Sequence, residues 1–205
     1  MVAVTTGVDR LIDTIRPYLL DDRVIAAIRA VPRDRFVPPE LAREAWDNVP
    51  LPIGAGQTIS QPLVVARMCE LLRLTGSERV LDVGTGSGYH AAVLAQLCAH
   101  VWSIERHASL SRQAALNLAA AGIRNVTLAV GDGTLGLPDV APFDGINVAA
   151  ASTRVPDALE AQLAPGGRLV APVENGDQRL LVVHRARDGT LERHALERVR
   201  FVPLV

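Results

Sequence analysis

Few of the features that mark metal-binding, redox-active or secreted proteins occur in this sequence of 205 residues. It has two cysteines, and neither Cys69 nor Cys98 has a neighbour at the spacing of a zinc site or a redox motif. The five histidines are scattered along the chain, so we expect no metal site. Because a chain with so few cysteines suits a reducing compartment, we expect a cytoplasmic protein.

Long hydrophobic runs and an excess of charge of one sign are missing as well. No stretch approaches the ~20 uninterrupted apolar residues of a membrane span. The N-terminal stretch lacks the basic start, apolar run and small-residue cleavage site of a secretory signal. The formal net charge is −1, which gives no electrostatic reason to bind nucleic acid or an anionic membrane. We therefore expect binding to neither, and we also expect a monomer.

The hydrophobic pattern divides the chain near residue 60. Before it, apolar residues at helical spacing predict a helix up to Leu20, interrupted at Pro17, and a second helix over DDRVIAAIRAV. A short helix is expected from Glu40 to Trp46, followed by a loop over VPLPIGAGQTISQP. We assign residues 1–60 to an N-terminal helical lobe with a substrate loop, and 61–205 to a core that completes one structural unit.

Within that core, short apolar runs alternate with helical segments. Strands are expected in ERVLDVG, HVWSIE, VTLAVGDG, FDGINVAAA and GGRLVAPV, with helices between them. This alternation predicts an α/β fold with a doubly wound, mostly parallel, Rossmann-like sheet. The pair Asp188-Gly189 lies between two further apolar runs, which predicts a hairpin and antiparallel strands at the C-terminal end.

A glycine-rich loop follows the first strand of the core. Gly84, Thr85, Gly86, Ser87 and Gly88 end that strand and precede a helix that begins at Tyr89. Glycine lets the backbone turn tightly and approach a ligand closely, which this strand-to-helix context requires. A tight turn without a ligand is the alternative interpretation.

Acidic residues at successive strand ends select between possible ligands. Asp82 precedes the glycine loop, where a carboxylate would repel a pyrophosphate but suits the cationic amino-acid part of S-adenosylmethionine. Glu105 ends the next strand, where an acid can accept hydrogen bonds from both ribose hydroxyls. Asp132 and Gly133 end the third strand and could bind the adenine, although Asp-Gly pairs are also common turns. The set favours S-adenosylmethionine over a dinucleotide.

Several motifs, taken in order, resemble one family. The runs VPRDRFVPPEL, PLPIGAGQTISQP, LDVGTGSGYHAAVLA, VGDG, APFDGI and VRFVPL occur in the order seen in protein-L-isoaspartate O-methyltransferases. The resemblance extends from about Val31 to Leu204 and implies a class I methyltransferase fold. It also implies methyl transfer from S-adenosylmethionine to the free α-carboxylate of L-isoaspartyl residues in damaged proteins. The methyl ester then collapses spontaneously to a succinimide, and hydrolysis of the succinimide regenerates some normal aspartate.

The resemblance also implies roles for individual residues. Ser60 in the TIS motif is the active-site position, with Thr58 as a second catalytic hydroxyl, and Thr58, Ile59 and Ser60 are expected to touch the cofactor. An ionised carboxylate needs no general base, so small hydroxyl donors that hold it near the methyl group are sufficient. From the residues alone, the N-cap of the helix that follows is the favoured role for Ser60, and both roles could hold together.

Three other functions stay open at this point. A related carboxyl methyltransferase dedicated to one biosynthetic peptide would keep the cofactor residues and change the N-terminal lobe. A protein that binds S-adenosylmethionine without catalysis would keep the loop and the acids alone. A nicotinamide dehydrogenase fits least well, because the loop is GxGxG and is preceded by an aspartate.

Overall fold

The computed structural model describes residues 6–204. Its helices are α1 (Gly7–Ile15), α2 (Asp22–Ala30), α3 (Pro62–Leu72), α4 (Tyr89–Leu94), α5 (Ala108–Ala120) and α6 (Asp157–Ala161). Short 3-10 turns are η1 (Arg16–Tyr18), η2 (Arg33–Phe36), η3 (Pro39–Leu41), η4 (Glu44–Trp46), η5 (Gly133–Leu135) and η6 (Pro138–Val140). The strands are β1 (Leu51–Gly54), β2 (Gln57–Ile59), β3 (Arg79–Val83), β4 (His100–Glu105), β5 (Val126–Val130), β6 (Phe143–Val148), β7 (Leu163–Asn175), β8 (Asp177–Arg185) and β9 (Leu191–Arg198).

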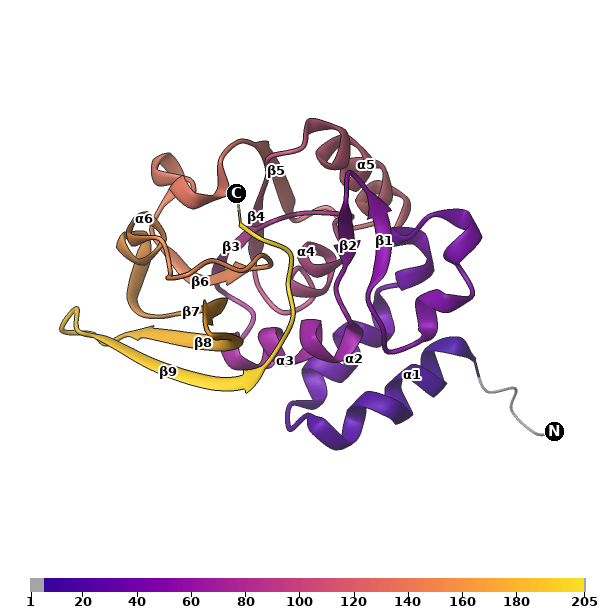
Figure 1. Ribbon diagram of the computed structural model, residues 1–205, viewed down its shortest axis with the longest axis horizontal. Helices are drawn as coiled ribbons and strands as arrows, with labels where there is room; N and C mark the ends of the chain where they lie inside the picture. Colours follow the sequence, from indigo (N-terminus) through magenta and orange to yellow (C-terminus); the bar gives the residue numbers. More distant parts are fainter. Residues whose placement is uncertain (1–5, 205) are drawn as a thin grey trace.

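A seven-stranded sheet in the order β5-β4-β3-β6-β7-β8-β9 forms the centre of the molecule (Figure 1). Strands β3 to β7 pair in parallel, and β8 and β9 add antiparallel pairs at one edge. The turn between β8 and β9 contains Asp188, whose carboxylate accepts from the Thr190 amide at 2.9 Å. The predicted fold class, including its antiparallel C-terminal strands, is therefore confirmed.

The two faces of the sheet bury two separate groups of aliphatic side chains. Along β3, Val80 packs on the face covered by the N-terminal helices, α3 and α4, whereas Leu81 and Val83 pack on the face covered by α6. This division follows from the alternation of side chains along a strand. The first group also includes Leu11 and Ile28, so the N-terminal helices share one core with the sheet.

The N-terminal segment differs from the expectation in two places. Residues Leu51–Gly54 and Gln57–Ile59 pair as an antiparallel hairpin, where a loop was expected. The stretch from Glu40 to Trp46 forms the 3-10 turns η3 and η4, where one short helix was expected. As predicted, the first helical segment is interrupted near Pro17: α1 ends at Ile15, and Pro17 lies in the 3-10 turn η1. Helix α2 begins after Asp21, whose side chain accepts from the Arg23 amide. Within residues 6–204, no helix has both the length and the hydrophobicity needed to cross a membrane.

Candidate active site

A cleft opens at the carboxyl ends of β3, β4 and β6. The strand order reverses direction between β3 and β6, and ligands of open α/β sheets bind at such a point. Most of the lining comes from the β2 segment, the glycine loop with the start of α4, the end of β4, the residues after β6, and Val202 to Leu204. Val65 and Gly133 complete it.

The glycine loop forms the floor of the cleft beside α4. Gly84, Gly86 and Gly88 have φ angles of 93°, 53° and 90°, a region that L side chains rarely adopt. The loop is tied to β4, because the Gly84 amide donates to the Ile104 carbonyl at 2.9 Å. A Cβ atom at Gly86 would lie 3.2 Å from Ile53 of the β1–β2 hairpin. Gly86 therefore lets the hairpin and the loop approach each other.

Glu105 ends β4 with its carboxylate in the cleft wall. One oxygen accepts from the Gly86 amide and the other from the His107 amide, each at 2.9 Å. A carboxylate oxygen has a second lone pair, so each can accept one further hydrogen bond. The side chain is only 6% exposed. The sequence placed Glu105 here as the acceptor for a ribose, and the position and orientation of its carboxylate are suited to that role.

Asp82 lies beneath the cleft, and it is not part of the lining. Its carboxylate accepts from Ser103 Oγ and from Asn147 Nδ2, each at 2.7 Å, and Thr85 Oγ1 lies 2.6 Å from Ser103 Oγ. Ser103 and Asn147 are the register partners of Asp82 on β4 and β6, so three adjacent strands build the group. Complete burial raises the Asp82 pKa from 3.8 to about 6.

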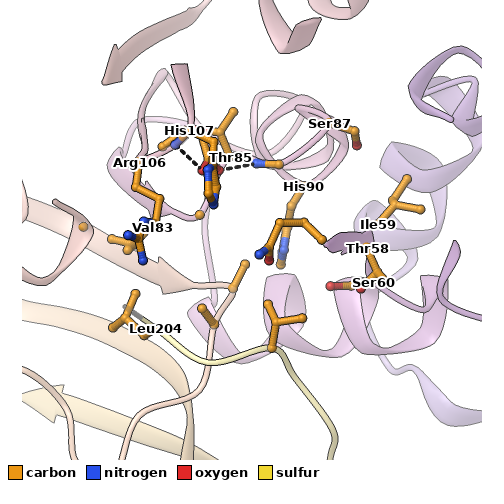
Figure 2. A pocket seen from close by; sticks show the side chains of 18 of the residues that line it. Thr58, Ile59, Ser60, Val83, Thr85, Ser87, His90, Arg106, His107 and Leu204 are labelled. Atoms are coloured by element: carbon orange, nitrogen blue, oxygen red, sulfur yellow. Dashed lines mark hydrogen bonds between the residues drawn. The ribbon is translucent and has the colours of Figure 1, made fainter. Parts of the chain in front are cut away.

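His90 faces the cleft from the first turn of α4 (Figure 2). Its Nδ1 lies 3.2 Å from Asn147 Nδ2, while its Nε2 is buried and has no hydrogen-bond partner among the described residues. Burial lowers the His90 pKa to about 3, so the ring is neutral at physiological pH. The contact between His90 and Asn147 was not foreseen.

The predicted catalytic segment lies on the opposite wall. Thr58, Ile59 and Ser60 all line the cleft, and Figure 2 shows the Ser60 hydroxyl directed toward the side where His90 lies. The alternative role of Ser60 as a helix N-cap is wrong, because Gln61 occupies that position before α3. The Ser60 side chain is therefore not engaged as the cap of α3.

Arg33, which sequence reasoning passed over, holds this segment from behind. Its buried guanidinium donates to the carbonyls of Ala45, Val49 and Ser60 at 2.6, 3.0 and 3.1 Å. Burial lowers its pKa to about 10, so it keeps its charge at neutral pH. The result is a positive charge fixed behind the Ser60 backbone. It links the N-terminal lobe to the catalytic segment.

The far end of the cleft contains Gly133 and the C-terminal residues. Gly133 lines the cleft, and a Cβ atom there would lie 2.6 Å from Val83. Asp132 is exposed and is not among the lining residues; its side chain accepts from the Thr134 amide at 2.9 Å and N-caps η5. Hydrogen bonds from the Thr134 hydroxyl, at 2.7 Å, and from the Thr134 amide keep the Asp132 pKa below its usual value. Leu204 closes this end, bonded through its amide to the Ala151 carbonyl.

The residues present fit S-adenosylmethionine. Glu105 offers two acceptor oxygens where the ribose hydroxyls would bind, and Ile104 and Leu204 offer apolar walls for a base. The buried Asp82 carboxylate has hydrogen-bond donors but no cationic partner among the described residues, so its negative charge favours a cation above the loop. His90 adds a nitrogen without a partner in the cleft wall. We therefore keep the predicted cofactor contacts as proposals, with Asp82 acting through the loop.

Comparison with known proteins gives consistent matches over nearly the whole chain. The family model "Protein-L-isoaspartate(D-aspartate) O-methyltransferase (PCMT)" matches residues 7–205. Protein-L-isoaspartate O-methyltransferase 2 of Marinobacter nauticus is 55% identical over 187 residues, which cover 90% of this chain and 85% of that protein. A protein-L-isoaspartate O-methyltransferase of Anaeromyxobacter dehalogenans is 56% identical, with 90% of each chain covered.

Solved structures give the same picture. A protein-L-isoaspartate O-methyltransferase aligns with a TM-score of 0.85 and 27% identity over 96% of this chain and 65% of that chain. A Plasmodium falciparum structure of the same description, in complex with S-adenosyl-L-homocysteine, aligns with a TM-score of 0.83 and 25% identity. That alignment covers 96% of this chain and 97% of the other.

Proposed function

The chain belongs to the protein-L-isoaspartate(D-aspartate) O-methyltransferase family, and from this premise we propose that it methylates the free α-carboxylate of L-isoaspartyl residues in damaged proteins. One observation carries the proposal: a single cleft joins the glycine loop and Glu105 on one wall to Ser60 on the other. S-adenosylmethionine supplies an electrophilic methyl group when it is bound there. The protein has to place a carboxylate in line with that methyl group.

The residues around Ser60 suit an anionic acceptor. The Thr58 and Ser60 hydroxyls can each donate one hydrogen bond to a carboxylate oxygen, which positions it without protonating it. The buried guanidinium of Arg33, bonded to the Ser60 carbonyl at 3.1 Å, gives this wall a favourable electrostatic sign. A carboxylate is ionised at neutral pH, so methyl transfer to it needs no general base. His90, which also lines the cleft, is neutral at this pH.

The bond changes balance without another reactant. A carboxylate oxygen of the substrate forms a bond to the methyl carbon, the carbon–sulfur bond breaks, and its electron pair stays on sulfur, so that S-adenosylhomocysteine is released. In the methyl ester, the amide nitrogen that follows along the chain attacks the ester carbon and methanol leaves. Water opens the resulting succinimide and regenerates aspartate in part. The later steps need no enzyme, so the chain's task ends with the ester.

Within this proposal the two parts of the chain have separate tasks. Residues up to 60 recognise the substrate, since they supply the segment from Thr58 to Ser60 and the Arg33 that holds it. Residues 61–205 supply the other contacts to the cofactor, beside those of Thr58, Ile59 and Ser60. We further propose that the protein is a cytoplasmic monomer. Cys69 and Cys98 are buried and unpaired, which suits a reducing compartment.

The test compares two peptides that differ only in one L-isoaspartyl or L-aspartyl residue, using methyl-labelled S-adenosylmethionine. We expect label on the isoaspartyl peptide alone, released as methanol in mild base. Methylation of neither peptide, with cofactor binding intact, would contradict the proposal. Such a result would favour a dedicated biosynthetic peptide as substrate, or a relative that binds the cofactor without catalysis.

A further inference from the structure

The hydrogen bonds around Asn147 determine which nitrogen of His90 carries the proton. An ionised Asp82 can only accept, so the group of Asn147 that faces it at 2.7 Å is the amide nitrogen. The same nitrogen lies 3.2 Å from His90 Nδ1. Because an amide nitrogen donates hydrogen bonds and does not accept them, Nδ1 is the acceptor in this contact. With Nδ1 accepting, the neutral ring carries its proton on Nε2.

The protonated nitrogen lies in the wall of the cleft with no partner. His90 is 6% exposed, and its Nε2 atom is buried and has no hydrogen-bond partner among the described residues. An isolated donor in a buried site is costly to leave unpaired. A ligand atom that accepts a hydrogen bond would remove this cost, and a carboxylate oxygen is the strongest acceptor available.

We propose that His90 is a fixed, neutral hydrogen-bond donor for a carboxylate bound in the cleft. This inference rests on the proposed function for its two candidate partners: the amino-acid carboxylate of the cofactor and the carboxylate of the substrate. Both carry the same chemistry and both would lie between the glycine loop and Ser60. A neutral donor orients either group without protonating it, which a nucleophilic carboxylate in particular requires.

The buried strand residues position this donor. Asp82, Ser103 and Asn147 are register neighbours on β3, β4 and β6, so the sheet itself fixes their spacing. Ser103 donates to one oxygen of Asp82, and Asn147 donates to the other. The amide of Asn147 therefore cannot rotate without losing its bond to Asp82. Because this fixed amide donates to His90 Nδ1, it keeps the His90 proton on Nε2. This gives a role to an asparagine that is otherwise unusual in a buried strand.

The first experiment measures the proton directly. A long-range proton–nitrogen correlation spectrum of the full chain should show His90 as a single tautomer, with the proton on Nε2. In Asn147→Leu the amide is removed, and the spectrum should change to a mixture of tautomers. A proton found on Nδ1 in the unaltered chain would overturn the proposal.

The second experiment identifies the partner carboxylate through affinities. His90→Leu removes the donor, His90→Gln replaces it by an amide N–H, and His194→Leu on the exposed face of β9 controls for the loss of a histidine. Calorimetry measures binding of S-adenosylhomocysteine and of its decarboxylated analogue, and peptide kinetics measure KM. Losing a hydrogen bond to a charged group weakens binding roughly 10- to 100-fold.

Each source of carboxylate has its own pattern. If the partner is the cofactor, His90→Leu weakens S-adenosylhomocysteine by that factor but leaves the decarboxylated analogue unchanged, and His90→Gln restores most of the affinity. If the partner is the substrate, both cofactor affinities stay and KM for the isoaspartyl peptide rises. Unchanged values for all ligands in a folded His90→Leu variant would overturn the proposal. Because the calorimetric result needs no turnover, it remains informative if the isoaspartyl activity itself is not found.

Discussion

Replacing Asp82 with asparagine is expected to change how the stability of the fold depends on pH. The Asp82 carboxyl is fully buried without a cationic partner among the described residues, and burial raises its pKa from 3.8 to about 6. A native pKa above the unfolded one means that the native state holds the extra proton. The stabilisation is therefore complete below the unfolded pKa and is lost as pH rises through the native one.

The size of the effect follows from that difference in pKa. At ~1.36 kcal/mol per unit, a rise from 3.8 to about 6 corresponds to roughly 3 kcal/mol that is lost when Asp82 ionises in the native state. The amide introduced by Asp82→Asn has no such titration. The free energy of unfolding of the unaltered chain, taken relative to Asp82→Asn, should therefore fall by roughly 2–3 kcal/mol from about pH 4 to about pH 8.

Urea unfolding across this pH range measures the difference. The hydrogen bonds that asparagine makes less well to Ser103 and Asn147 add a cost that does not vary with pH, so the slope isolates the titration. Asp139→Asn removes an exposed carboxylate and controls for the loss of one negative charge. Parallel stability curves for the unaltered chain and Asp82→Asn would refute the reasoning.

Three further substitutions test other parts of the site. Arg33→Met leaves the carbonyls of Ala45, Val49 and Ser60 without their buried donor. Urea unfolding should show that the free energy of unfolding falls by about 3 kcal/mol, and a fall below about 1 kcal/mol would argue against this role. Glu105→Ala removes the proposed ribose acceptor and a tie to the Gly86 amide, so calorimetry should show S-adenosylhomocysteine binding weakened roughly 100-fold, and an unchanged affinity would disprove the assignment. Ser60→Ala should lower kcat roughly 10- to 100-fold while S-adenosylhomocysteine affinity changes little. A Ser60→Ala variant that lost cofactor binding instead would assign the serine to the cofactor.

The parts of the site that the sequence predicted are those that lie at the ends of strands. The glycine loop and Glu105 are recognisable because a strand-to-helix turn needs glycines and because parallel strands end at one edge of the sheet. The order of strands and helices was predictable for a similar reason, since each strand is a short apolar run bounded by turn residues.

The features that were missed depend on contacts between distant residues. Asn147 lies next to Asp82 only because β6 pairs with β3 in one particular register, and Arg33 reaches Ser60 only through the packing of the N-terminal lobe. The β1–β2 hairpin resembles a loop because its strands have four and three residues and contain proline and glycine. Ser60 was a candidate N-cap because serine suits that position, but Pro62 begins α3 and makes Gln61 the cap.

The most direct test of the central claim follows the fate of one isoaspartyl peptide by liquid chromatography and mass spectrometry. The chain is incubated with the peptide and S-adenosylmethionine, and the methyl ester, the succinimide and the aspartyl peptide are measured over time. We predict that S-adenosylhomocysteine forms in step with the ester, and that repeated cycles convert isoaspartyl peptide into aspartyl peptide. An isoaspartyl peptide that stays unmethylated, while S-adenosylhomocysteine binds normally to the same preparation, would contradict the account.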